Sequence, residues 1–181
     1  MIVVVSGMPG CGSTTTARLL AKKLKLKFFS VGAYTKKIMR EDMKIDKKET
    51  ERSVDFWKTK RGKSKEHHVT VERMQEDLAK RGDIVIEGKI SIRFIKNADF
   101  RIWLKAPLNV RAKRYVKRDN LMLKDAMRFL KEKQRDEREN WKKIYGFDYF
   151  IQEKEADLII DTMNKKPEEI VKMIINSIKV N

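Results

Sequence analysis

A glycine-rich stretch near the amino terminus, residues 7–15 (GMPGCGSTT), has the spacing of a phosphate-binding loop. It follows an apolar, β-branched run at residues 2–5 and leads into a helical pattern that begins at Thr14. A loop in this position directs backbone N–H groups and the positive end of a helix dipole towards one point, which suits a phosphate. The alternative is an ordinary turn between a strand and a helix. The spacing of the three glycines favours the phosphate loop.

The loop departs from the usual pattern G-x-x-x-x-G-K-[ST] at one position, because Ser13 stands where the lysine is expected. That lysine reaches the β- and γ-phosphates, and a charged hydrogen bond of this kind contributes about 1.5–3 kcal/mol. Ser13 offers a hydroxyl group but no charge, so we expect a Lys or Arg from elsewhere in the chain to replace it. Thr14 falls where the loop hydroxyl ligates Mg²⁺, and the same hydroxyl is suited to capping a helix.

Arginines are concentrated in a charged helical region from about residue 109 to residue 145. Arg111, Arg114 and Arg118 fall at i, i+3 and i+7, on one face of a helix, and Arg135 and Arg138 follow. Two such helices would close as a lid over phosphates, where phosphoryl transfer needs positive charge and the exclusion of water. The alternative is a solvated helix face with ion pairs between neighbouring turns.

The order of apolar runs and helical patterns predicts an α/β fold. Strands are expected at residues 2–5, 28–30, 84–86, 100–104 and 158–160. Helical patterns separate these runs, the long charged region breaks near Asp119 and Asn120, and Pro167 lies in the first turn of a final helix. This alternation favours a parallel sheet with helices on both faces, within a single domain of 181 residues.

The chain is strongly basic, with 43 Lys and Arg against 26 Asp and Glu and a formal net charge of +17. Such a field favours polyanions, namely nucleotides, nucleic acid or an anionic membrane surface. The alternative is a lysine-rich surface suited to a hot or saline habitat. The composition excludes disorder and a membrane-spanning class, and the single cysteine, Cys11, suits a reducing compartment. With no secretion signal in view, we expect a cytoplasmic protein without zinc, and a monomer.

Several longer stretches carry a resemblance to a known family. In addition to the loop, these stretches are RGDIVIEGKIS (81–91), NADFRIWLKAPLNVRAKR (97–114), RDEREN (135–140), KKIYGFD (142–148) and ADLIIDT (156–162). They resemble the archaeal-type cytidylate kinases, small nucleoside monophosphate kinases with a P-loop NTPase fold. The resemblance implies a five-stranded parallel core (1–33, 81–114 and 145–181), a helical monophosphate-binding insertion (34–80) and a short lid (115–140). It also implies phosphoryl transfer from ATP to CMP or dCMP with Mg²⁺.

The resemblance also implies roles for residues at matching positions. Those for ATP binding are Gly7, Met8, Pro9, Gly10, Cys11, Gly12, Ser13, Thr14 and Thr15 of the loop, with Arg114 and Arg118 of the lid. Those that bridge the phosphates of the two substrates, or stand beside them, are Arg135, Arg138 and Lys142. Those for the monophosphate are Lys36, Arg73, Lys89 and Ser91, and those for Mg²⁺ are Thr14 and, through water, Glu87.

Three features depart from the family pattern and keep rival hypotheses open. Ser13 replaces the loop lysine, Lys36 and Lys89 stand near positions where Arg is usual, and residues 58–65 are unusually basic. Lys binds a phosphate as a point charge without the bidentate fork of Arg. One rival is a nucleotide-binding protein that has lost kinase activity and binds RNA or a ribonucleoprotein. Another is a kinase whose acceptor is AMP, UMP or a nucleic-acid end.

Other residues are interpreted as structural. His67 and His68 are adjacent, so on a helix they point to different faces and make a poor metal pair, and we expect them at the surface. Trp57, Trp103 and Trp141 are widely spaced and are expected to pack in the core or lid. Cys11 is interpreted as a small residue that fits the loop; the alternative is a thiol with a lowered pKa that oxidises.

Overall fold

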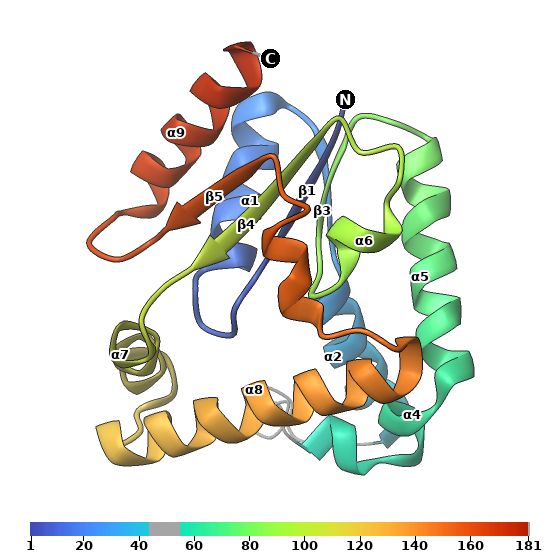
Figure 1. Cartoon of the computed structure of the whole chain (residues 1–181), viewed down its shortest axis with the longest axis vertical. Helices are drawn as coiled ribbons and strands as arrows, with labels where there is room; N and C mark the ends of the chain where they lie inside the picture. Colours follow the sequence, from blue (N-terminus) through green and yellow to red (C-terminus); the bar gives the residue numbers. More distant parts are fainter. Residues whose placement is uncertain (44–54, 181) are drawn as a thin grey trace.

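The computed structural model describes residues 1–43 and 55–180. Within these residues the chain forms a parallel β-sheet with helices on both faces (Figure 1). The predicted insertion, residues 34–80, includes residues 44–54, which lie outside the described part of the chain.

The sheet positions the site because all its strands run in the same direction. Across the described residues five strands pair in the order β2-β3-β1-β4-β5. They are β1 (Ile2–Gly7), β2 (Lys27–Ser30), β3 (Ile84–Glu87), β4 (Phe100–Lys105) and β5 (Leu158–Asp161). In the central strand, Val5 is in register with Glu87 of β3 and Ile102 of β4. The predicted five-stranded parallel sheet is confirmed, and its carboxyl ends meet at one edge, where ligands bind in folds of this kind.

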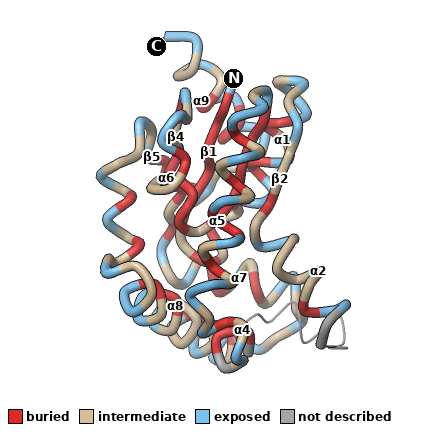
Figure 2. The backbone as a smooth tube through the Cα atoms, turned by 90° about the vertical axis from the view of Figure 1, so that its right-hand side faces the viewer, coloured by how far each residue is buried: buried red, intermediate tan, exposed pale blue. Residues whose placement is uncertain are grey.

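Alternate residues of β1 explain why helices cover both faces. Val3 and Val5 pack with α1 (Ser13–Leu24) and α9 (Pro167–Val180), while Ile2 and Val4 belong to a second apolar cluster. That second face is covered by α5 (Lys65–Lys80), α6 (Ser91–Phe94) and the 3-10 helix η2 (Tyr149–Glu153). The tube of β1 is buried along its length (Figure 2).

A helical hairpin lies beyond the carboxyl ends of the strands. It consists of α7 (Leu108–Asp119) and α8 (Leu123–Tyr145), and α8 runs across that end of the sheet (Figure 1). Ala112, Tyr115, Ala126 and Leu130 form its own small core. The turn between the two helices is at Asn120, whose φ of 52° ends α7 at the predicted break.

The remaining helices complete the wall around this end of the sheet. They are α2 (Val31–Met43), the 3-10 helix η1 (Asp55–Lys58) and α4 (Lys60–Lys63). Phe56 and Trp57 of η1 and Met39 of α2 are buried in the same apolar cluster as Trp141 of α8. The described part of the predicted insertion therefore packs directly against the second helix of the hairpin.

Candidate functional site

The loop between β1 and α1 has a shape that depends on its glycines. Gly10 and Gly12 have φ angles of 80° and 92°, in the left-handed region that other residues avoid. A Cβ atom on Gly7 would lie 2.3 Å from the carbonyl oxygen of Leu104, so β4 comes too close for any side chain there. Gly12 also precedes the first turn of α1, which has no side-chain cap. The amino end of α1 is therefore open towards a ligand, as phosphate binding requires.

Ser13, at the position of the missing lysine, is held by a buried carboxylate. Its Oγ donates a hydrogen bond of 2.9 Å to Oε1 of Glu87, and Ser30 Oγ donates one of 2.6 Å to Oε2. Glu87 is only 8% exposed. The ends of β2 and β3 and the loop after β1 thus meet at one carboxylate. The serine hydroxyl supports Glu87 and brings no charge to the loop.

Arginines of α7 tie the loop to the rest of the site. Arg114 donates to the carbonyl oxygens of Gly10 and Thr162, at 3.2 and 2.8 Å, and to Thr162 Oγ1 at 3.0 Å. The buried Arg111 donates to the carbonyl oxygen of Pro9 at 3.1 Å. Arg118 stacks over the ring of Tyr115, 4.1 Å from its centroid. Of these three arginines, Arg114 and Arg118 line the cavity described below.

A cavity of about 620 Å³ brings most of the predicted site residues together. Its wall joins the phosphate loop to the insertion and to both helices of the hairpin. Predicted residues that line it are Pro9, Gly10, Cys11, Gly12, Ser13, Thr14, Thr15, Lys36, Glu87, Lys89, Arg114 and Arg118. Gly7 and Met8 are not part of this wall; Gly7 ends β1, and Met8 packs against the apolar core.

Two residues predicted to bind the monophosphate lie elsewhere. Arg73 is exposed and lines a separate hollow, together with Met74 and Asp77, on α5. This placement differs from the prediction, because α5 turns His67, His68 and Val71 towards the main cavity instead. Ser91 also differs, since it is fully buried and donates a 2.5 Å hydrogen bond to Oε1 of Gln75.

Helix α8 presents a different face to the cavity from the one predicted. Arg135 pairs with its neighbour Asp136, with 64% of the Arg135 side chain exposed. Arg138 pairs with Asp148 and lies over the ring of Phe150, and Lys142 is exposed. The structure brings Arg135, Arg138 and Lys142 to no part of the cavity wall.

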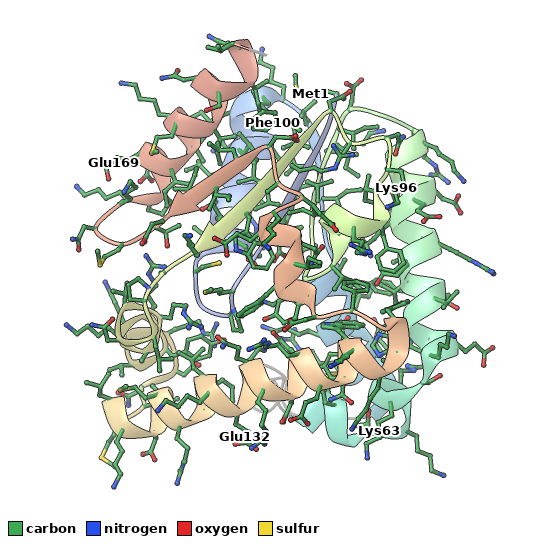
Figure 3. All side chains as sticks on the ribbon, viewed as in Figure 1. Met1, Lys63, Lys96, Phe100, Glu132 and Glu169 are labelled. Atoms are coloured by element: carbon green, nitrogen blue, oxygen red, sulfur yellow. The ribbon has the colours of Figure 1, made fainter. Side chains whose placement is uncertain are left out.

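The cavity-facing positions of α8 are Lys133, Glu137 and Trp141. They follow one another at intervals of four residues, which keeps them on one side of a helix. The same stripe begins with the buried Ala126 and Leu130, and Glu132 points away from the sheet (Figure 3). Lys133 and Glu137 were not assigned a role from the sequence, although continuing the apolar stripe along the helix would have reached them.

Aromatic rings form another part of the cavity wall. The His68 ring stacks on Trp57, with centroids 5.2 Å apart, and Trp141 meets both rings edge-on at 4.7 Å. The ring nitrogen Nε2 of His68 lies 2.7 Å from the carbonyl oxygen of Gly62. The expectation of a surface position was wrong for His68, which is 4% exposed. The packing role predicted for Trp57 and Trp141 is confirmed, but these rings also face the cavity.

Burial shifts the pKa values of two histidines and one cysteine in this wall. Burial lowers the pKa of His68, and it lowers the pKa of His67 from 6.5 to about 4. Electrostatic repulsion from His68 makes a smaller contribution to the shift of His67. Both rings are therefore neutral at pH 7. Burial also raises the pKa of the Cys11 thiol, which is 1% exposed, so the structural interpretation of Cys11 holds and the reactive alternative does not.

Comparison with known proteins places this geometry in a family. The sequence model of the cytidylate kinase-like family matches residues 2–164. The chain belongs to this family. The cytidylate kinases of Methanocaldococcus jannaschii and Methanobrevibacter smithii are 31% and 33% identical to this family member. These alignments cover 98% and 99% of the chain, and 97% and 99% of the two relatives.

Solved structures of low sequence identity show the same fold as this cytidylate kinase-like chain. Shikimate kinase from Bacteroides thetaiotaomicron aligns with a TM-score of 0.63 at 17% identity, covering 99% of this chain and 98% of the other. An uncharacterized protein from Eubacterium ventriosum aligns with a TM-score of 0.72 at 14% identity, covering 100% and 99%. The predicted kinase fold is confirmed. In the described part of the chain, no helix combines the length and apolar character needed to cross a bilayer.

Proposed function

We propose that this member of the cytidylate kinase-like family transfers the γ-phosphoryl group of ATP to CMP or dCMP, giving ADP and CDP or dCDP. The cavity of about 620 Å³ carries the proposal, because a phosphate loop and a wall of aromatic rings line the same space. Phosphates of two nucleotides would meet near the loop. The relatives called cytidylate kinases, which align over almost the whole chain, support CMP as the acceptor.

Phosphoryl transfer requires the protein to position the substrates and to supply positive charge, and it needs no covalent enzyme intermediate. Backbone N–H groups of the loop and the amino end of α1 bind the donor phosphates. Arg114 and Arg118 approach from α7, and Lys36 supplies charge to the acceptor phosphate. An α-phosphate oxygen of the monophosphate attacks the γ-phosphorus in line. The bond from that phosphorus to the β,γ-bridging oxygen breaks, and ADP leaves with the electron pair.

Mg²⁺ is the expected cofactor, and the donors beside the loop suit it. Thr14 has an exposed side chain at the start of α1, and Glu87 is a buried carboxylate held by two serine hydroxyls. Among the residues described, no three or more His, Cys, Asp or Glu side chains gather as a metal site. That suits an ion bound mainly by phosphates and water. Thr14 would hold it directly and Glu87 through water, and when bound it neutralises charge on the β- and γ-phosphates.

The aromatic rings in the cavity wall are suited to binding the base of the acceptor nucleotide. Trp57, His68 and Trp141 bring ring faces and edges to the cavity, and the neutral state of His68 avoids burying a charge against an uncharged base. Lys36 lines the same cavity and offers a cation for the monophosphate. A pyrimidine monophosphate would then direct its base to the rings and its phosphate to the loop.

An acceptor panel tests the proposal. Steady-state ADP formation from ATP and Mg²⁺ is measured with CMP, dCMP, UMP, AMP and GMP in separate reactions. We expect kcat/KM to be at least tenfold higher for CMP or dCMP than for the other acceptors. Equal values for all five, or a clear preference for AMP, would contradict the assignment of the acceptor.

The salt dependence of RNA binding distinguishes the rival hypothesis of an RNA-binding protein from the kinase proposal. Lys60, Arg61 and Lys63 of α4 make one short helix strongly basic. If this surface binds RNA, the affinity must fall steeply between about 50 and 200 mM salt, because cations are released from the phosphate backbone. We expect no such specific binding to a single-stranded RNA of twenty nucleotides. Tight, salt-sensitive binding in a protein without kinase turnover would favour the rival.

A further inference from the structure

A buried carboxylate on α8 lies between two lysines at the cavity. Glu137 has a side chain that is 6% exposed, and it lines the cavity together with Lys89 and Lys133. Lys89 Nζ lies 3.9 Å from Glu137 Oε2, and Lys133 Nζ lies 3.7 Å from Glu137 Oε1. The two oxygens of one carboxylate thus face two ammonium groups that come from distant parts of the sequence.

This arrangement is anchored to the phosphate loop. Lys89 Nζ donates a 2.9 Å hydrogen bond to the carbonyl oxygen of Gly7, the first residue of the loop. The backbone carbonyl of Lys89 accepts a 2.8 Å hydrogen bond from Gln152 Nε2, which fixes its main chain. One ammonium group of the pair is therefore held at the loop that lacks its own lysine.

The carboxylate itself is held by a neutral donor. The Tyr149 hydroxyl donates to Glu137 Oε2 at 3.1 Å, from a side chain with no exposed surface. Burial raises the pKa of Tyr149 well above its ordinary value, so the phenol keeps its proton and donates. Glu137 is thereby held in place by a hydrogen bond from an uncharged group.

Neither lysine makes a close hydrogen bond to Glu137. Charge-assisted hydrogen bonds between an ammonium and a carboxylate are about 2.7–2.9 Å long, and both contacts to Glu137 are longer than this. Glu137 therefore attracts each lysine without a close hydrogen bond. An ammonium has three N–H donors, of which Gly7 takes one from Lys89. The two lysines and Glu137 together carry a net charge of about +1.

We propose that Lys89 and Lys133 together supply the positive charge that the loop lacks at Ser13, and that Glu137 is a positioning residue that holds both ammonium groups there. The inference rests on the proposed phosphoryl transfer and adds the cations that bind the donor phosphates. Without the carboxylate, the two ammonium groups repel each other and turn away from the loop.

ATP binding by the full chain tests the charge. The dissociation constant for ATP with Mg²⁺ is measured by calorimetry, without an acceptor, and circular dichroism verifies that each variant is folded. Lys89→Met and Lys133→Met should each weaken ATP binding by about tenfold or more, because each removes a charged hydrogen bond. Lys131→Met is the matched control, an exposed lysine on the same helix, and should change binding less than twofold. Unchanged affinity in folded Lys89→Met and Lys133→Met would overturn the proposal.

The positioning role of Glu137 is tested by whether the effect of Glu137→Gln on ATP affinity reverses when both lysines are removed. Glu137→Gln keeps an oxygen for the Tyr149 hydroxyl and removes the negative charge. With both lysines present, it should weaken ATP binding threefold or more, because the lysines leave the loop. In the Lys89→Met/Lys133→Met double variant, the same change should tighten binding threefold or more, because only repulsion of the phosphates is removed. Tightening of equal size in both backgrounds would overturn the positioning role. The acceptor panel is a separate experiment, so absence of turnover there contradicts the kinase proposal without deciding this one.

Discussion

Removal of the Ser13 hydroxyl tests whether this residue supports Glu87 instead of a phosphate. Ser13 Oγ donates to Glu87 Oε1 at 2.9 Å, and Glu87 is only 8% exposed. A hydrogen bond to a charged group contributes about 1.5–3 kcal/mol, and a carboxylate this buried has little water to replace the donor. Ser13→Ala should therefore lower the free energy of unfolding by about 1.5–3 kcal/mol. For a chain of this length, each kcal/mol lowers the melting temperature by about 2–4 °C. Turnover should fall less than tenfold.

Thr14→Ala is the matched control for Ser13→Ala. Thr14 is the next residue of the loop and is exposed, so its removal should change the free energy of unfolding by less than about 0.5 kcal/mol. It should lower turnover by tenfold or more, because Thr14 is the expected Mg²⁺ ligand. The free energies come from urea denaturation at pH 7 without nucleotide. If Ser13→Ala leaves stability unchanged and abolishes ATP binding, Ser13 is a phosphate ligand and does not support Glu87.

Three further predictions follow from the geometry of the loop, the aromatic wall and a buried carboxylate. Gly10→Ala should weaken ATP binding tenfold or more in a folded protein, because φ at Gly10 is +80° and the added Cβ would lie 3.0 Å from the Tyr115 ring; calorimetry showing normal affinity would contradict this. Trp141→Ala should raise the KM for CMP tenfold or more and that for ATP less than threefold, and equal changes would argue against a base site at these rings. Burial raises the pKa of Glu72 from its ordinary 4.5 to about 8, so the folded state keeps a proton that the unfolded chain has lost. The contribution of Glu72 to stability should therefore fall as pH rises from about 5 to 8, whereas the lowered pKa values of His67 and His68 act in the opposite direction below 6.5. Glu72→Gln should flatten the fall in stability between about pH 7 and 8 in urea denaturation; an unaltered slope there would count against it.

The sheet and the phosphate loop could be predicted because both are local patterns. The β-branched run of β1 and the glycine spacing after it carry their information within a few residues. Pro167 likewise marks the first turn of α9, and Asn120 marks the end of α7. In each case the residue type restricts the backbone directly. The order of the strands in the sheet, β2-β3-β1-β4-β5, depends on contacts between distant segments, so it was not predicted from these local patterns.

The inward face of α8 could not be predicted from charge alone. Positive residues lie on every side of this helix, and the prediction chose Arg135 and Arg138. Apolar contacts of Leu130 and Trp141 decide the orientation, and they turn Lys133 and Glu137 inwards. From the sequence alone, a charged residue at such an inward-facing position is predicted to be exposed.

The aromatic wall shows a second limit of prediction from sequence. Trp57, His68 and Trp141 are separated by up to 84 positions and meet only because η1, α5 and α8 pack together. No periodicity within one helix signals such a contact. Each ring taken alone is consistent with ordinary packing, so its exposure to the cavity becomes visible only in the structure.

The fate of the γ-phosphoryl group tests most directly whether this protein is a CMP kinase. The protein is incubated with Mg²⁺, CMP and ATP labelled with ³²P in the γ position, and the products are separated by chromatography. The label should move into CDP, at a rate that depends on CMP, although the loop has Ser13 and no lysine. Label found only in inorganic phosphate, or retained in ATP that the protein binds, would contradict the kinase proposal.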